Sequence, residues 1–339
     1  MDLLLGEQAP NMNGSTITEF VLLGFSCSRT VQLFIFALVL ACYTTVLLGN
    51  VLIMVTVWSE PQLSQCPMYF FLVNLSLTDV SLGSLAAPKL VIDLLNNGHA
   101  ISYEGCMAQI FGFHLFAATE MYLLTLMAYD RYIAICHPLR YTTIMGQQRC
   151  LGLLILCWMA AFIHSTFHMA VITRLPFCGP NVLDNFFCDS LQVIKLACSD
   201  IYIVEKLEML NDSLVILPCF LSLLVSYVTI LATLCGRFGK SSRKTFSTCS
   251  SHLTVVGLFY IATVLVYLKP SSHSQLEKMA SVFFMVVTPA LNPLIYTLRN
   301  QEMKVAIGKL QNKCKLFLLS QREYICLSEH LKEESDGAQ

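Results

Sequence analysis

The sequence has few charged residues for its length. Of its 339 residues, 13% are charged and 55% are hydrophobic, whereas a typical soluble domain carries about 25% charged residues. The mean hydropathy of +0.64 points the same way. These values exclude a disordered chain, a collagen-like chain and an ordinary cytosolic enzyme. A long chain with so little charge is expected to be an integral membrane protein.

Other missing features narrow the class further. The net charge is −1, so no basic surface field is present to hold nucleic acid. Fifteen cysteines are too few for a disulfide scaffold and suggest one or two specific bridges. The sequence has no HExxH, GxSxG, P-loop or GxGxxG motif, so we expect no enzyme, no catalytic residue and no metal centre. The sequence also lacks an inverted repeat of the kind that would suggest a transporter.

Long apolar runs are the main positive feature. A helix crosses a bilayer with about 20 mostly apolar residues, and the runs do not alternate as the strands of a barrel would. The sequence therefore predicts an all-α bundle of seven transmembrane helices. The start of the fifth is the least clear, because Glu205, Lys206, Glu208 and Asp212 crowd it. The predicted spans are 31–57, 67–87, 107–127, 150–171, 213–235, 247–268 and 279–298.

The basic residues orient the bundle. With the N-terminus outside, the inner segments hold about twice as many Lys and Arg residues as the outer ones. We therefore divide the chain into an extracellular tail (1–30), a seven-span domain (31–298) and a cytoplasmic tail (299–339). A glycosylation sequon at Asn13 agrees with this orientation. Residues 306–317 mix lysines with apolar residues and predict a short amphipathic helix on the inner membrane surface, with a disordered tail as the alternative.

The third predicted span carries charges that need an explanation. Glu120 lies seven residues after Phe113, and Arg131 lies eleven residues after Glu120. These spacings are close to two and three helical turns, so the three residues share one stripe. The stripe should face the bundle, because a charge in lipid is costly. At its inner end, Asp130 and Arg131 either form an ion pair that locks the helix or snorkel to the interface.

A second carboxyl group lies about mid-membrane in the second predicted span. Asp79 and Glu120 together would form an acidic centre that suits a hydrated sodium ion or a proton. The alternative is a pair of carboxyl groups, at least one of them protonated, that are hydrogen-bonded to Asn50, Ser76 or Asn292.

Apart from Cys27 in the N-terminal tail, which is expected to be a free thiol, four cysteines are predicted on the outer side, where the environment is oxidising. Cys106 opens the third span, and Cys178, Cys188 and Cys198 lie in the long outer loop. Four cysteines allow three pairings, and spacing alone leaves all three open.

Two histidines stand one turn apart in the fourth predicted span. His164 and His168 have a spacing that can bind a metal. Because no cysteine or carboxylate lies near them in the sequence, packing or hydrogen bonding is the favoured interpretation.

Several motifs, in this order, resemble those of the olfactory receptors, which are rhodopsin-like G-protein-coupled receptors. The resemblance covers about residues 13 to 310. Gln65-Cys66 departs from the usual His-Thr of the family, and the tail is longer than usual. The matching segments are Gly49-Asn50, Pro67–Leu72, Met127–Cys136, Ser226-Tyr227, Lys244–Leu253 and Pro289–Tyr296.

The resemblance implies a receptor at the plasma membrane of olfactory neuron cilia. Such receptors bind small volatile molecules between the outer halves of their helices and activate a stimulatory G protein of the olfactory type, which raises cyclic AMP. The family also implies the disulfides Cys106–Cys188 and Cys178–Cys198. The residues that it assigns to activation and G-protein coupling are Asp130, Arg131, Tyr227, Lys244, His252, Asn292, Pro293 and Tyr296.

Helical spacing suggests which residues line the ligand pocket, with ordinary helix packing as the alternative for each. Amine receptors carry an Asp in the outer third helix where this chain has Phe113. We therefore expect a neutral ligand, such as an alcohol, aldehyde, ketone or ester. The candidate residues are Phe113, His114, Ala117, Ala118, Asn211, Tyr260, Thr263, Tyr267, Val282 and Met285.

Two other functions compete with this interpretation. One is a rhodopsin-like receptor for a non-odorant small molecule outside the olfactory epithelium. The other is a transporter or channel, which would move a substrate without any G protein.

Overall fold

The structure is a computed structural model, and it describes residues 17–25, 28–96, 99–178, 181–235, 240–267, 274–313, 315–316 and 321. The side chains of Lys244 and Tyr267 and the whole of Asn13 lie outside this description.

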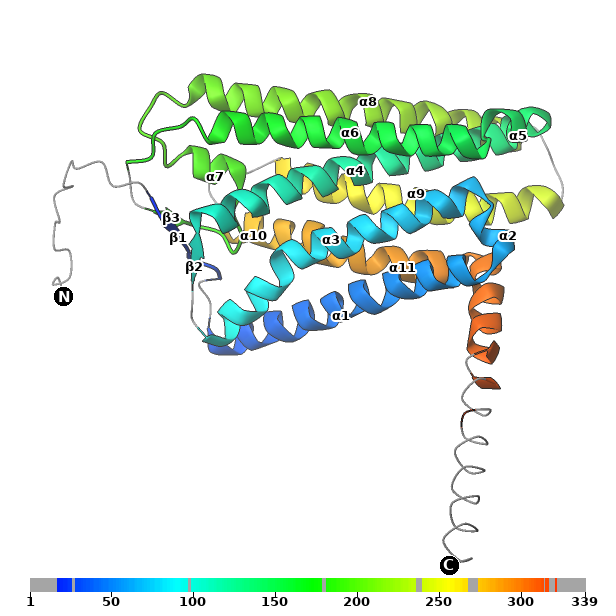
Figure 1. Ribbon diagram of the computed structural model, residues 1–339, viewed down its shortest axis with the longest axis horizontal. Coiled ribbons are helices and arrows are strands. Elements are labelled where there is room, and N and C mark those ends of the chain that lie inside the picture. Colours follow the sequence, from blue (N-terminus) through cyan, green and yellow to red (C-terminus); the bar gives the residue numbers. More distant parts are fainter. Residues whose placement is uncertain are drawn as a thin grey trace, which may run out of the picture.

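Seven long helical stretches run along the described part of the chain and form one bundle (Figure 1). Six of them are long and apolar enough to cross a membrane, and α9 adds the shorter apolar stretch His252–Val264. The prediction of a seven-transmembrane helix bundle is confirmed. The seven stretches are α1 (Arg29–Ser59), α3 (Pro67–Asn96), α4 (Tyr103–Cys136), α6 (Gln147–Ile172), α8 (Tyr202–Cys235), α9 (Lys240–Tyr267) and a seventh made of α10 (Ser274–Val282), a π-helical segment (Phe283–Val287) and α11 (Thr288–Arg299).

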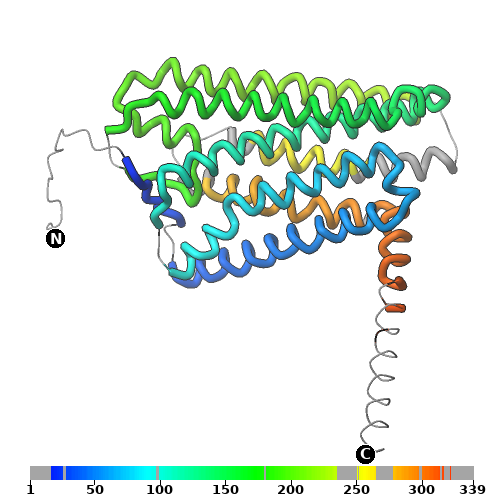
Figure 2. Tube along the Cα trace, viewed as in Figure 1, coloured from blue at the N-terminus to red at the C-terminus, as the bar shows by residue number. Residues whose placement is uncertain are grey.

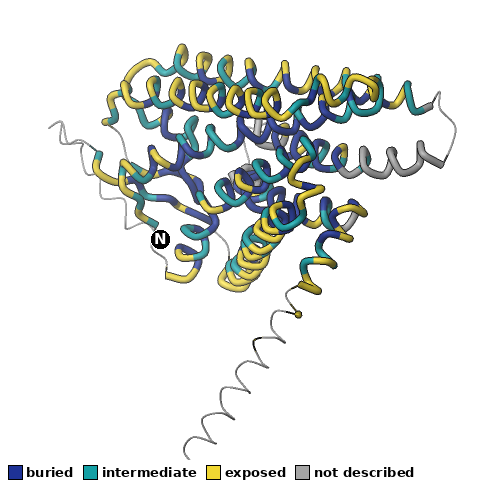
Figure 3. Tube along the Cα trace, turned by 45° about the vertical axis from the view of Figure 1, so that its right-hand side comes forward, coloured by how far each residue is buried: buried dark blue, intermediate teal, exposed yellow. Residues whose placement is uncertain are grey.

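The outward faces of the helices are apolar. Phe34 and Trp58 of α1 are 70% and 72% exposed, and Leu214 of α8 is 66% exposed. Figure 3 shows such exposed positions along the outer flanks of the bundle. A soluble protein rarely exposes apolar surface on this scale, so these faces fit a surrounding of lipid chains.

Several helices extend beyond their predicted ends, and two departures from the sequence prediction bear on the site. The fifth helix, α8, begins at Tyr202 rather than near Ser213, so its first turns carry Glu205, Glu208 and Asp212 into the bundle. The seventh helix is interrupted by the π-helical segment at Phe283–Val287, which precedes Asn292-Pro293. An extra residue in one turn rotates every later side chain, so this segment resets which faces of the helix point inward.

The outer end is closed by a small sheet and by the long loop. The strands β1 (Glu19–Leu22), β2 (Ala100–Ser102) and β3 (Val182–Leu183) pair in the order β2-β1-β3. β1 is antiparallel to β2 and parallel to β3, and Phe20 and Leu22 of β1 are fully buried. Residues 17–25 are therefore part of the folded outer cap.

A buried lysine joins this cap to the seventh helix. Lys278 of α10 is 1% exposed, and its Nζ donates to the carbonyl oxygen of Gly24 at 2.6 Å and to Asp184 Oδ1 at 2.5 Å. A buried ammonium group must be paired in this way. Lys278 thereby links three segments that are distant in the sequence.

Short elements close the inner end, where the chain turns back between the long helices (Figure 2). They are α2 (Pro61–Ser64), the 3₁₀ turn Pro138–Arg140 and α5 (Tyr141–Ile144). A further helix covers residues 301–313, where the sequence predicts one from 306. Its Met303 and Ala306 are buried, and its Lys309 pairs with Glu60 at 3.3 Å. This helix is amphipathic, as expected.

Close contacts between helices depend on glycine. A Cβ atom added to Gly49 of α1 would lie 2.8 Å from Cβ and Cγ of Pro293 in α11. The proline ring is rigid and cannot turn away as a long side chain would. Gly49 therefore sets the spacing between the first and seventh helices.

We predict that Gly49→Ala destabilises the protein by about 1–3 kcal/mol, because the new methyl group overpacks this contact. The thermal unfolding midpoint of the purified protein measures the effect. Gly152→Ala in α6 is the matched control, since a Cβ there meets nothing within 4 Å. The control should be neutral or slightly stabilising, and equal behaviour of the two variants would contradict the prediction.

Candidate ligand pocket and activation sites

A cavity of about 260 Å³ lies in the outer half of the bundle. Most of its wall surface is apolar, which is typical of a small-molecule site, and polar and charged side chains form the rest. α4, α6, α8, α9, the seventh helix and the outer loop all contribute to it. The lining residues are Phe113, His114, Ala117, Ala118, Met121, His164, Asp189, Ser190, Leu191, Lys195, Glu205, Met209, Asp212, Val215, Ile216, Thr263 and Phe284.

The face of α4 toward the cavity follows from its sequence. Phe113 and Ala117 are one turn apart, and so are His114 and Ala118, so the four residues share one broad face. The two alanines leave space where larger side chains would fill it. The ring of Phe113 packs against the ring of Phe284 with centroids 5.8 Å apart. This contact joins α4 to the seventh helix at the edge of the cavity.

The outer loop is held over the cavity by covalent and hydrogen bonds. A disulfide joins Cys106 of α4 to Cys188, and a second joins Cys178 to Cys198, which is the pairing that the family resemblance implies. The backbone N–H of Cys188 donates to Gln109 Oε1 at 2.8 Å. These bonds place the following short helix α7 (Ser190–Ile194) where its first residues line the cavity.

Half of the predicted pocket residues line this cavity: Phe113, His114, Ala117, Ala118 and Thr263. The others whose side chains are described do not. They are Asn211, Tyr260, Val282 and Met285.

The structure shows where these side chains lie instead. Asn211 points to α6, where its Nδ2 donates to the carbonyl oxygen of His164 at 3.4 Å, and its neighbour Asp212 faces the cavity instead. Val282 and Met285 are buried in the core, and Phe284 of the π-helical segment lines the cavity in their place.

Tyr260 is also turned away from the cavity. Its ring packs against Phe220 of α8, with centroids 5.3 Å apart, and against Phe259. The residue joins α9 to α8 rather than meeting a ligand in this cavity.

Sequence reasoning missed the contribution of α6 and of the first turns of α8. His164 lines the cavity, as do Met209 and Asp212. The predicted fifth span begins after Asp212, whereas α8 begins at Tyr202 and brings this residue into the bundle. The acidic residues near this boundary were the only sequence feature that could have indicated a longer fifth helix with polar groups inside the bundle.

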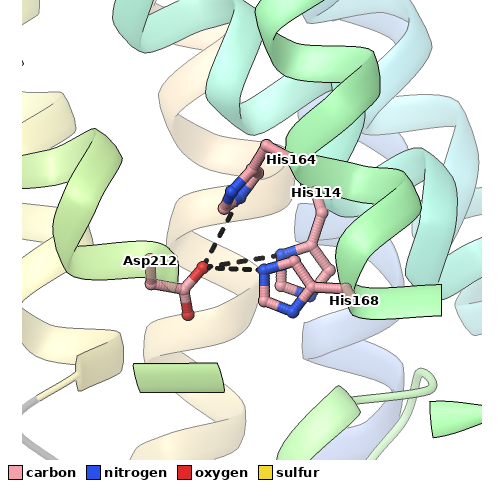
Figure 4. A group of neighbouring side chains, drawn as sticks. All are labelled: His114, His164, His168 and Asp212. Carbon is pink, nitrogen blue, oxygen red and sulfur yellow. Dashed lines mark hydrogen bonds and ion pairs between the residues drawn. The ribbon is translucent and has the colours of Figure 1, made fainter. Parts of the chain in front are cut away.

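Asp212 gathers three histidines around one oxygen (Figure 4). Its Oδ1 lies 3.1 Å from His168 Nε2, 3.6 Å from His164 Nε2 and 3.8 Å from His114 Nδ1. On the other side of its ring, the Nδ1 of His168 bonds to the carboxylate of Glu208. The carboxylate partners that the sequence around His164 and His168 lacked come from α8.

The acidic centre is assembled by the seventh helix. Asn292 Nδ2 donates to both oxygens of Asp79, at 2.9 and 3.1 Å, and to Glu120 Oε1 at 3.4 Å. Of the three suggested hydrogen-bonding partners, Asn292 is the one used. Asn50 donates to the carbonyl oxygens of Val46 and Pro289 instead. Asp79 and Glu120 are both buried, at 1% and 0% exposure.

At the inner end, the residues assigned to activation meet partners on other elements. The hydroxyl of Tyr227 in α8 bonds to His252 Nδ1 in α9. Asp130 accepts a hydrogen bond from the hydroxyl of Tyr141 at 2.8 Å. Burial, with the adjacent carboxylate, raises the pKa of Tyr141, so the hydroxyl keeps the proton that it donates. Among the residues described, no ion pair joins Asp130 to Arg131, so the suggested lock is replaced by the contact with Tyr141.

Comparison with known proteins agrees with this geometry. A sequence model of the family described as olfactory receptor matches residues 39–313. The chain is 53% identical to human olfactory receptor 4Q3 over 299 residues, which is 88% of this chain and 96% of that protein. It is 48% identical to human olfactory receptor 4K14 over 89% of this chain and 97% of that protein, and 44% identical to mouse olfactory receptor 4M1 over 89% and 96%.

These relatives are receptors rather than enzymes, and the matched region contains every helix of the bundle except the first residues of α1. With its membrane-spanning bundle, its outer cavity and this similarity over most of its length, the chain belongs to the olfactory receptor family.

Proposed function

We propose that the chain binds small, mostly neutral volatile molecules in the outer cavity and activates a stimulatory G protein of the olfactory type, which raises cyclic AMP. The site of action is the plasma membrane of olfactory neuron cilia. One observation carries the proposal: in an olfactory receptor, a small cavity with mostly apolar walls lies under a disulfide-tethered loop.

The cavity supports a ligand with an apolar body and one polar group. Phe113, Ala117 and Val215 offer apolar contacts, while Thr263 offers a hydroxyl. Thr263 Oγ1 donates to the carbonyl oxygen of Phe259 at 2.9 Å, which leaves its lone pairs to accept a bond from a ligand. Position 113 holds Phe where amine receptors have Asp. This difference argues against a cationic amine that binds as it does in those receptors.

Ligand binding would act on the inner face by shifting a conformational equilibrium. The contact between Tyr227 and His252 joins α8 to α9, and the contact between Asp130 and Tyr141 joins α4 to the inner loop. These contacts would differ between the two states, and Arg131 would meet the G protein. Lys244 at the inner end of α9, with Asn292, Pro293 and Tyr296 in α11, would support the same change.

We further propose that Asp79 and Glu120 hold a sodium ion. The residues fit a hard cation that prefers oxygen ligands. Besides the carboxylates, buried oxygen atoms of Ser76, Asn50 and Asn292 have no hydrogen-bond partner among the described residues, and neither does Glu120 Oε2. An ion would satisfy several of these oxygens together.

For the ligand site, we predict that Ala118→Phe raises the half-maximal odorant concentration at least about tenfold, because the ring fills the cavity. The measurement is cyclic AMP in cells that display the receptor, first tested against a chemically broad odorant panel. Ala170→Phe, on the exposed face of α6, is the matched control. At equal surface levels, an unchanged response of Ala118→Phe would place the ligand elsewhere.

For signalling, we predict that Arg131→Ala abolishes the cyclic AMP response while odorant binding persists, because the change lies at the inner end of α4. Arg149→Ala removes an exposed arginine from the inner end of α6 and should leave the response intact. Equal responses of the two variants at matched surface levels would exclude the proposed role of Arg131.

For the ion, we predict that sodium chloride raises the thermal unfolding midpoint above its value in potassium chloride at the same ionic strength. Asp79→Asn should remove this difference, because it removes a charged oxygen ligand. Asp93→Asn is the control on the same helix, where the carboxylate pairs with Lys89 at 2.7 Å. A wild-type receptor that responds equally to both salts would refute the sodium site.

A further inference from the structure

Four potential metal ligands converge at one point in the wall of the cavity (Figure 4). They come from three helices: His114 from α4, His164 and His168 from α6, and Asp212 from α8. One ligand atom of each lies within 4.8 Å of the corresponding atoms of the other three. We propose that these four side chains bind a zinc ion.

The distances are close to those of a tetrahedral site. Zinc bonds to histidine nitrogen and carboxylate oxygen are about 2.0–2.1 Å long, which places neighbouring ligand atoms about 3.4 Å apart. The three nitrogens lie 3.1, 3.6 and 3.8 Å from Asp212 Oδ1. These values bracket the tetrahedral spacing, so small side-chain rotations complete the site.

A second carboxylate prepares His168 for this role. The ring of His168 is fully buried, and its Nδ1 bonds to the carboxylate of Glu208, which is 1% exposed. A proton held between Nδ1 and Glu208 leaves the lone pair of Nε2 directed at the site. Metal-binding histidines usually have a carboxylate or carbonyl partner on their other nitrogen, and that partner fixes the tautomer and the ring orientation.

The charges of the cluster also favour a dication. Asp212 and Glu208 bring two carboxylates into a bundle where uncompensated charge is costly. A zinc ion with three neutral imidazoles balances them. Without a metal, the two carboxylates are neutralised either by protonation of a carboxyl group or by two imidazolium ions. The second arrangement would place positive charge on rings in contact, since those of His114 and His168 stack with centroids 3.6 Å apart. Two positive charges at that separation repel each other.

The ligand set and its access indicate the metal and its role. Imidazole and carboxylate ligands without a thiolate or thioether suit zinc, whereas magnesium and calcium prefer oxygen alone. His114, His164 and Asp212 face the cavity, which provides a path of entry. Four protein ligands close the coordination sphere, so the ion would tie α4, α6 and α8 together beside the ligand pocket and leave no open position for hydrolysis.

Zinc binding to the purified full-length receptor tests the proposal without any odorant or G protein. After chelator treatment, zinc chloride should bind at about one ion per receptor, as measured by competition with a chromogenic chelator. It should also raise the unfolding midpoint by at least about 3 °C, because the ion binds only the folded state. Magnesium chloride should do neither.

Three variants and one control localise the site. His164→Ala and the nearly isosteric Asp212→Asn should abolish stoichiometric binding. Glu208→Gln should weaken it about 10–100-fold through His168. His99→Ala removes a histidine at the outer end that is not part of the cluster and should bind zinc as the wild type does.

Two results would overturn the proposal. One is a wild-type receptor that binds no zinc at micromolar free concentration. The other is binding that Asp212→Asn and Glu208→Gln leave unchanged. The unfolding midpoint of each metal-free variant shows whether it is folded, and the milder Glu208→Gln keeps the test decisive if the other variants do not fold.

Discussion

The structure depends on a small set of polar contacts that join one helix to another inside the apolar bundle. Asp79 and Glu120 meet Asn292 of the seventh helix, and Tyr227 meets His252. In lipid these groups have no water to turn to. Each of these contacts therefore fixes the rotation of its helix about the helix axis. The apolar side chains of the same helix would be equally stable in lipid at any rotation. The polar contacts specify the packing more sharply than the hydrophobic surfaces do.

Hydropathy was enough to predict the bundle, because each span is a run of apolar residues that can be recognised from its own sequence alone. The stripe on the third helix was predictable for the same reason, since its spacing is local. Glu120 and Phe113 do face inward, and both lie at polar or ligand-facing positions. What the sequence could not supply was the partner of each group. Asn292 was one of three candidates for Asp79, and Tyr141 was not foreseen as the partner of Asp130.

The predicted residues that do not line the cavity share one cause. Helical spacing gives the relative direction of side chains along one helix, but it does not fix which face of that helix points inward, and one inserted residue rotates the face. Phe284 of the π-helical segment lines the cavity rather than Met285, and Asp212 of α8 lines it rather than Asn211. Each replacement is a shift of one position. The four α4 residues do line the cavity, because that helix is regular along this stretch and begins at a defined cap, Ser102.

The seventh helix is the element that connects the two halves of the receptor. Phe284 touches the ligand cavity, and Asn292, eight residues later, holds the acidic centre. Pro293 follows against Gly49, where the first helix leaves no free space. If a ligand displaces Phe284, the seventh helix can therefore not accommodate this displacement by moving sideways near Pro293. The π-helical segment includes Phe284 at the cavity and ends before Asn292, and such segments occur frequently at functional sites. A ligand can change the inner face only if it binds one arrangement of this helix more tightly than another.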